Sequence, residues 1–263
     1  MKHFAAIIPL LIAAVLLMSS CKDKPVNIFT IEDDKALGLQ ISEEIANDTN
    51  YKILDESKYP SAYQHLRRIR DSILASGQVP HATDFVWECK ILDDTVLNAF
   101  CTPGGYIYVY KGIIQFLDNE SQFAGVLGHE MAHAARRHST QQLTQAYGVS
   151  VLLSVVLGDD PGLLAQITAQ LVMLAFSRSH ENDADAESVK YLYSTTYDAR
   201  GVAGFFEKLQ TAQSGGLSIP FLSTHPSDEK RIENINAKWT ELGGKTGQLY
   251  ETSYQAFKNS LPK

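Results

Sequence analysis

The sequence of 263 residues has little positive charge, few cysteines and no repeats. Its 23 basic residues are outnumbered by 30 acidic ones, and this balance argues against nucleic acid as a partner. Neither a repeat at the periods of solenoid proteins nor a low-complexity tract is present, which excludes a solenoid domain. An apolar fraction of 44% and an aromatic fraction of 10% instead predict a globular fold of one substantial domain.

The first 20 residues have the layout of a secretory signal. Lys2 precedes an apolar stretch over residues 4–18, and two serines come directly before Cys21. This stretch is too short for a membrane span. The cysteine after two small residues resembles a bacterial lipobox, in which the cysteine is lipidated and becomes the mature N-terminus. Plain secretion and an uncleaved anchor are the alternatives. Without residues 1–20, 22 basic and 30 acidic residues leave a net charge of −8.

The expected organisation has three segments. Residues 1–20 are a lipoprotein signal peptide, residues 21–29 a lipid-anchored tether, and residues 30–263 a single folded domain. Such a chain would be held at a membrane of the bacterial cell envelope by its N-terminal lipid and would face the periplasm. Lys22 stands where inner-membrane lipoproteins of enteric bacteria carry aspartate, which favours the outer membrane over the inner.

Hydrophobic periodicity predicts a mostly helical α+β fold. Helices are expected over residues 31–47 and 60–75, where apolar residues recur every three or four positions. Aromatic and branched residues over 85–92 and 106–110 predict a small antiparallel sheet around the turn that begins at Pro103. From about residue 119 onward the pattern is mostly helical.

Two apolar runs in the helical part, residues 149–157 and 163–176, are separated by a glycine-rich and proline-containing break. Each is too short to cross a bilayer, so a helical hairpin that covers the core is predicted. A membrane-dipping or substrate-gripping role for residues 149–157 is the alternative.

The two remaining cysteines, Cys89 and Cys101, lie on neighbouring candidate strands. Outside the cytoplasm two such thiols either form a disulfide or stay as two buried free thiols, and the sequence leaves both interpretations open.

The motif HEMAH covers residues 129–133, in the middle of a helix that Asn119 is expected to cap. Histidines four positions apart point from one helical face, so the imidazoles of His129 and His133 can reach one zinc ion. Glu130 then stands beside the metal, where its carboxylate can take a proton from the attacking water. A helix with two surface histidines is the alternative.

A third protein ligand is needed to complete such a zinc site. The long metzincin pattern would require glycine at 136 and histidine at 139, but the chain has Arg136 and Ser139, so that class is excluded. His138 lies five positions after His133 and is expected to be turned away from the shared face.

A better third ligand is Glu181, on a predicted helix downstream. Asp185 lies one helical turn after it, where it can accept the second N–H of a ligand imidazole and fix the orientation of that ring. His180 is a neighbouring rival, but its side chain leaves the helix about 100° from that of Glu181.

Four blocks of the sequence resemble the HtpX and Ste-type zinc metallopeptidase family, and most closely its compact periplasmic lipoprotein branch. They are residues 98–108, 129–133, 177–185 and 224–226. The resemblance implies a zincin-type, gluzincin-like domain over residues 30–263 that hydrolyses internal peptide bonds with one Zn²⁺ per chain.

The resemblance also implies residue roles. His129, His133 and Glu181 would be the zinc ligands, Glu130 the general base and later the proton donor, and Asp185 the partner of a ligand histidine. Asn98, Ala99 and Phe100 would form an edge strand that holds an extended peptide by main-chain pairing, and His225 would donate to the oxyanion. Arg231 could orient nearby carboxylates, although an arginine on a helix more commonly lies at the surface.

The expected substrates are unfolded or misassembled envelope polypeptides, which indicates a role in protein quality control. The alternative is a zinc-stabilised periplasmic chaperone or assembly factor with latent proteolysis. His180 and His225 are extra imidazoles that could fill the open zinc position of a latent site.

Overall fold

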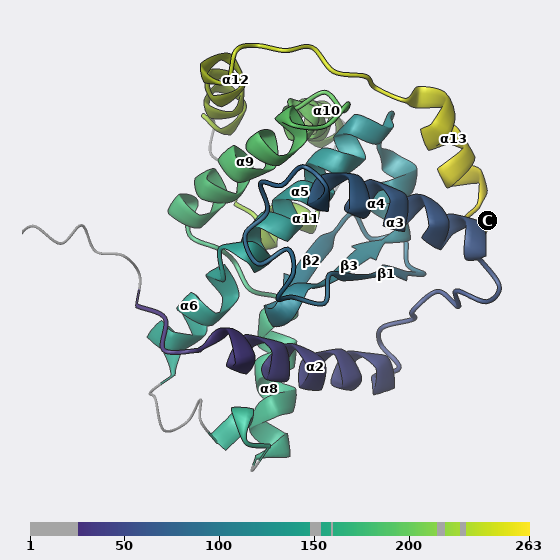
Figure 1. The fold of residues 1–263 in the computed structure, drawn as a ribbon. Helices are drawn as coiled ribbons and strands as arrows, with labels where there is room; N and C mark the ends of the chain where they lie inside the picture. The colour runs from purple at the N-terminus through teal and green to yellow at the C-terminus, as the bar shows by residue number, and fades with distance from the viewer. Residues whose placement is uncertain (1–25, 148–153, 159, 215–218, 227–229) are drawn as a thin grey trace, which may run out of the picture.

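The computed structural model describes residues 26–147, 154–158, 160–214, 219–226 and 230–263, which form a mainly helical domain around one small sheet (Figure 1). The predicted signal peptide, its Cys21 and most of the tether lie outside these residues. The helices are α2 (Ile31–Asn47), α3 (Pro60–Leu74), the 3₁₀ turn η1 (Pro103–Gly105), α4 (Lys111–Phe116), α5 (Glu120–Ala135), α6 (His138–Ala146), α8 (Pro161–Val172), α9 (Arg178–Tyr193), α10 (Gly201–Ser214), α11 (Phe221–Thr224), α12 (Arg231–Glu241) and α13 (Glu251–Asn259).

The sheet has three strands, β1 (Glu88–Leu92), β2 (Ala99–Thr102) and β3 (Tyr106–Tyr110), in the order β1-β3-β2. The antiparallel pairing predicted between residues 85–92 and 106–110 is wrong, because β1 and β3 are parallel. The antiparallel pair is β2 with β3. The tight turn of η1 joins these two strands, so they form the hairpin, and β1 takes the other side of β3. The small sheet is therefore mixed.

This strand order also excludes the disulfide. Cys89 on β1 and Cys101 on β2 both lie opposite Ile107 of β3, so a whole strand separates them. Neighbouring strands are about 4.8 Å apart, which places the two Cα atoms roughly 10 Å apart, beyond the ~7 Å limit for a disulfide. Both cysteines are buried free thiols, as the alternative interpretation expected.

Both faces of the sheet are covered by helices. Phe100, Tyr106 and Tyr108 pack in a core cluster with residues of α2, α6 and α8. The alternate strand residues, such as Cys101 and Ile107, belong to the larger cluster built around α3, α5, α9 and α10. The sheet therefore lies between α2 and α8 on one side and α3 and α5 on the other (Figure 1).

The predicted helices over 31–47 and 60–75 are confirmed as α2 and α3. α2 begins at a capping box in which Thr30 and Asp33 satisfy each other's backbone N–H groups. Gly38 on this helix lets the turn of η1 approach, since a Cβ there would lie 2.0 Å from the carbonyl oxygen of Pro103.

Helix α5 runs through the larger core cluster and is buried along almost its whole length. Asn119 caps it by accepting a hydrogen bond from the backbone N–H of Gln122, as predicted. A Cβ at Gly125 would lie 2.2 Å from the backbone nitrogen of Val202, so this glycine allows α10 to pack directly on α5. Helix α9 packs along α5 as well, and this pairing positions the site described below.

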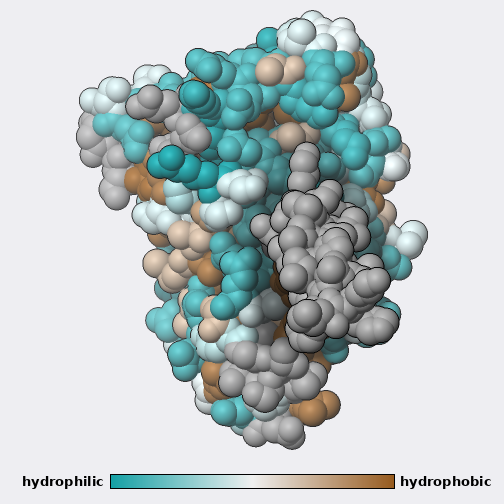
Figure 2. Space-filling view, turned by 90° about the vertical axis from the view of Figure 1, so that its left-hand side faces the viewer, coloured by the Kyte–Doolittle hydropathy of each residue, from teal (hydrophilic) through white to brown (hydrophobic). Residues whose placement is uncertain are grey.

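The second of the two apolar runs is confirmed as a helix, α8, whereas most of the first run lies outside the described residues. Among the helices that the structure describes, none combines the length and apolarity needed to cross a bilayer. Figure 2 shows one face of the molecule, on which hydrophilic residues predominate in the upper part and apolar residues form smaller patches.

Candidate metal centre

Three separate elements bring the candidate ligands together. α5 carries His129 and His133 on its last two turns, and α9 carries Glu181 in its first turn. α9 begins where it does because the side chain of Ser177 accepts a hydrogen bond from the third backbone N–H of the helix. His225 follows the short helix α11. All four side chains are at most 1% exposed.

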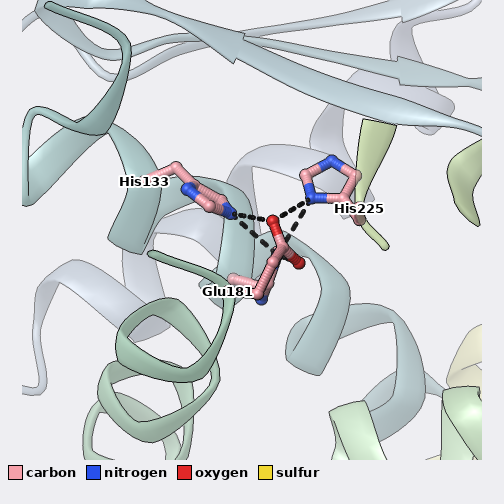
Figure 3. Close-up of side chains that lie close together, drawn as sticks. His133, Glu181 and His225 are labelled. Carbon is pink, nitrogen blue, oxygen red and sulfur yellow. Dashed lines mark hydrogen bonds and ion pairs between the residues drawn. The ribbon is translucent and has the colours of Figure 1, made fainter. Parts of the chain in front are cut away.

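The donor atoms of His129, His133, Glu181 and His225 all lie within 4.8 Å of one another. Nε2 of His133 is 3.0 Å from Nε2 of His129 and 3.3 Å from Oε1 of Glu181. Nδ1 of His225 lies 3.1 Å from the same carboxylate oxygen. Figure 3 shows the side chains of His133, Glu181 and His225 pointing toward one another from their separate elements.

These spacings fit a tetrahedral zinc ion. Bonds of about 2.1 Å to nitrogen and oxygen would hold tetrahedral donors about 3.4 Å apart, close to the observed 3.0–3.3 Å. Two imidazoles with one carboxylate are also a donor set that catalytic zinc sites use. The residues present therefore fit the metal that the sequence predicts.

Glu130 lies beside this donor group and is itself fully buried. Neither of its carboxylate oxygens has a hydrogen-bond partner among the described residues, although Nε2 of His225 is 3.4 Å from Oε1. Burial without hydrogen bonds raises the pKa of this carboxyl group above its usual value. A buried carboxyl group in such surroundings is a candidate general base.

A buried arginine supports the site from behind. Asp185 places Oδ1 2.8 Å from Nδ1 of His129. Arg231 donates to both oxygens of Asp185, at 2.7 and 2.8 Å, and its Nη1 lies 2.7 Å from Oε2 of Glu181. The interpretation of Arg231 as a surface side chain is wrong, because it is only 1% exposed and stacks on Phe206. Only the packing of α12 against α9 could reveal this.

The pKa shifts at the site favour the protonation states that bind a metal. Burial raises the pKa of Asp185, but Arg231 and His129 outweigh it, so the net shift is downward. For Glu181, too, burial acts upward and is outweighed, above all by His225, so its pKa lies well below the usual value. Burial lowers the pKa of His133 well below its usual value. The two carboxylates are therefore ionised and His133 is neutral, which are the forms that bind a metal.

The other two histidines near the motif are not part of the donor group. His138 is turned from the face that carries the metal ligands, as expected, and its ring lies behind that of His133. His180 stacks on His138, with ring centroids 4.3 Å apart. Helical spacing does not predict the contact between His138 and His133, because this contact depends on the turn between α5 and α6.

The predicted edge strand is at an edge of the sheet. Ala99 and Phe100 begin β2, and Asn98 directly precedes the strand. All three are buried, with α5 and α8 packed against β2. The backbone carbonyl of Leu97 accepts from the N–H of Phe221, which ties the start of this edge to the helix before His225. The predicted role in holding a peptide remains a prediction.

Comparison with known proteins places this site in a family. The chain is 28% identical over 242 residues to the mitochondrial metalloendopeptidase OMA1 of Schizosaccharomyces pombe, which covers 88% of this chain and 70% of that protein. It is 33% identical over 159 residues to OMA1 of Arabidopsis thaliana, covering 60% and 32%, respectively. It is 26% identical over 186 residues to the beta-barrel assembly-enhancing protease of Escherichia coli, covering 65% and 38%.

The matched part of the chain therefore covers about a third of the length of the A. thaliana and E. coli proteins. Residues 60–238 match the model of peptidase family M48. This range contains the whole donor group together with Glu130, Asp185 and Arg231. The match covers more than half of the sequence, and the chain belongs to peptidase family M48.

Proposed function

We propose that the protein is a zinc-dependent endopeptidase that hydrolyses peptide bonds of cell-envelope polypeptides. One observation carries the proposal: a buried group of three imidazoles and a carboxylate lies beside a glutamate whose oxygens have no hydrogen-bond partner among the described residues. The relatives named above support it, since their names describe metalloendopeptidases and a protease.

His129, His133 and Glu181 would hold the zinc ion. When bound, zinc would polarise the scissile carbonyl group and lower the pKa of a water molecule at the site toward ~7. Asp185 keeps the proton of His129 on Nδ1, so that Nε2 presents its lone pair to the metal. Arg231 holds the carboxylates of Asp185 and Glu181 in place.

Glu130 supplies the proton chemistry. It accepts a proton from the attacking water and then delivers it to the nitrogen of the departing amine. Its raised pKa suits both tasks, because a carboxyl group that titrates closer to neutral pH can accept and return a proton. The backbone of β2, at the edge of the sheet, would pair with an extended substrate and position its scissile bond.

His225 is compatible with two roles. Its Nε2 faces Glu130, where it could donate to the oxyanion, and its Nδ1 faces the other three donors. If Nδ1 also binds the metal, four protein donors leave no position for water, and the resting enzyme is latent. Replacing His225 with alanine distinguishes the roles: cleavage becomes faster if the ring blocks the site and slower if it stabilises the oxyanion.

The function is tested by zinc content and cleavage of unfolded casein. The purified protein is expected to bind one zinc ion and to lose cleavage when a chelator removes it. Glu181→Ala should lose both zinc and activity. Glu187→Ala is the matched control, because Glu187 lies on the same helix outside the donor group. Casein cleavage that persists without metal, or full zinc content in Glu181→Ala, would refute the proposal.

The same proposal places the enzyme in the bacterial envelope, where a lipid on Cys21 would hold it at the outer membrane rather than the inner. It is supported by the lipobox-like sequence and by the name of the E. coli relative. The full chain should incorporate labelled palmitate in bacteria, and Cys21→Ala should not. A role in quality control predicts that Glu130→Gln fails to replace the wild type, whereas a chaperone role predicts that it succeeds.

A further inference from the structure

The turn after α5 places a histidine behind one of the metal ligands. Arg137 adopts a left-handed backbone conformation with φ of 61°, so the chain reverses and α6 begins at His138. The ring of His138 is thereby brought against His133, with their Nδ1 atoms 2.9 Å apart. His138 is only 2% exposed, so water does not compete for this contact.

The second nitrogen of His138 leads back to α9. Its Nε2 lies 3.2 Å from Oδ2 of Asp183, and the same oxygen accepts a hydrogen bond of 2.7 Å from Nε of Arg136. Asp183 is two residues after Glu181, so the helix that offers the carboxylate ligand also holds the end of this chain of contacts.

A metal ion at the donor group would fix which ring nitrogen carries the proton in both His133 and His138. Nε2 of His133 faces the donor group, so a metal bound there requires the ring proton to be on Nδ1. That proton can be donated only if Nδ1 of His138 carries a lone pair. The proton of neutral His138 is then on Nε2, where Asp183 accepts it. In this arrangement each donor meets an acceptor.

We propose that His138 and Asp183 are positioning residues, which hold His133 in the tautomer and orientation that bind the metal. This inference rests on the zinc site of the proposed function. It gives the two ligand histidines matching supports that both end at a guanidinium group. His129 is held by Asp185 and Arg231, and His133 is held through one additional imidazole by Asp183 and Arg136.

The test measures the zinc dissociation constant by chelator competition in the full chain. His138→Leu fills the space but removes the acceptor, and is expected to weaken zinc binding about 10- to 100-fold, as other losses of a ligand's hydrogen-bond partner do. His138→Gln keeps an acceptor oxygen and should restore most of the affinity. His65→Leu is the control, since His65 stacks on Phe257 and is not in the donor group.

Each outcome separates this inference from the proposed function. A wild type that does not bind zinc rejects the proposed function. A wild type that binds zinc, with His138→Leu binding equally well, rejects only the positioning role. Equal losses in His138→Leu and His138→Gln also reject it, because a general packing effect would not distinguish an acceptor from a hydrocarbon.

Nitrogen-15 NMR of the zinc-loaded wild type provides a second measurement that does not depend on whether the variants fold. His133 is expected with its proton on Nδ1 and His138 with its proton on Nε2. The opposite tautomer for neutral His138 would overturn the inference. Asp183→Asn should shift the His138 resonances and weaken zinc binding by less than His138→Leu does, because the direct partner of His133 remains.

Discussion

Two glutamates on α5 are both fully buried, yet their surroundings are opposite. At the start of the helix, Glu120 accepts hydrogen bonds from Arg68 at 2.7 and 2.6 Å, from Tyr197 at 2.8 Å and from Ser253 at 2.7 Å. Near the other end, neither oxygen of Glu130 has a hydrogen-bond partner among the described residues. One helix therefore contains a satisfied and an unsatisfied version of the same side chain.

The pKa values of the two carboxyl groups are shifted in opposite directions. Burial acts to raise the pKa of Glu120, but Arg68, Ser253 and Tyr197 outweigh it, and the net shift is downward. Burial raises the pKa of Glu130, and its neighbours do not reverse the shift. A buried polar group without partners costs free energy of folding, so it is retained where it serves another purpose. The contrast separates a residue that stabilises the fold from one that, in the proposed enzyme, would serve the chemistry.

The largest expected effect is the loss of activity on changing the unsatisfied glutamate. Glu130→Gln should lower kcat for casein cleavage by about 10²- to 10⁴-fold, because the general base is removed. Its zinc content should remain that of the wild type, since Glu130 is not in the donor group. Cleavage at the wild-type rate by this variant would show that Glu130 is not the general base.

The corresponding change at the satisfied glutamate should act on stability instead. Glu120→Gln loses charge-assisted hydrogen bonds to Arg68 and should lower the free energy of unfolding by about 2 kcal/mol. Once folded, the variant should cleave casein within about two-fold of the wild type. Urea unfolding and steady-state kinetics check both points. A variant of unchanged stability would show that the network around Glu120 contributes nothing.

The pH dependence of stability sharpens the contrast further, in the metal-free protein. Because its folded pKa is lowered, Glu120 stabilises the protein above its ordinary pKa of 4.5, and this contribution is lost as the pH falls through the folded value. Glu130 has a raised folded pKa, so its ionisation destabilises the protein at neutral pH. That cost disappears as the pH falls through the folded value toward 4.5.

The measurement is the melting temperature of each metal-free variant and of the wild type, from neutral pH down to below pH 4.5. At neutral pH, metal-free Glu130→Gln should be more stable than the wild type and Glu120→Gln less stable. Both differences should shrink on acidification, with that of Glu130→Gln vanishing at the higher pH. Differences of the same sign would contradict the opposite pKa shifts.

The local patterns of the sequence were sufficient for much of the fold. α2 spans residues 31–47, as apolar periodicity predicts, and Asn119 caps α5 as expected. The pairing of strands was not predictable in the same way. The composition of β1 and β3 is the same whichever way the two strands run, so it does not predict that they pair in parallel while β2 forms the hairpin with β3.

The sequence by itself determined the motif on α5 and the cap of that helix at Asn119, because both follow from neighbours within a few positions along the chain. It also indicated Glu181 as the third member of the group. Only the tertiary structure decided that Arg231 is buried against Asp185, that His138 faces His133, and that β3 separates the two thiols. Such contacts depend on how whole helices and strands pack, whereas helical spacing and capping are encoded in adjacent residues.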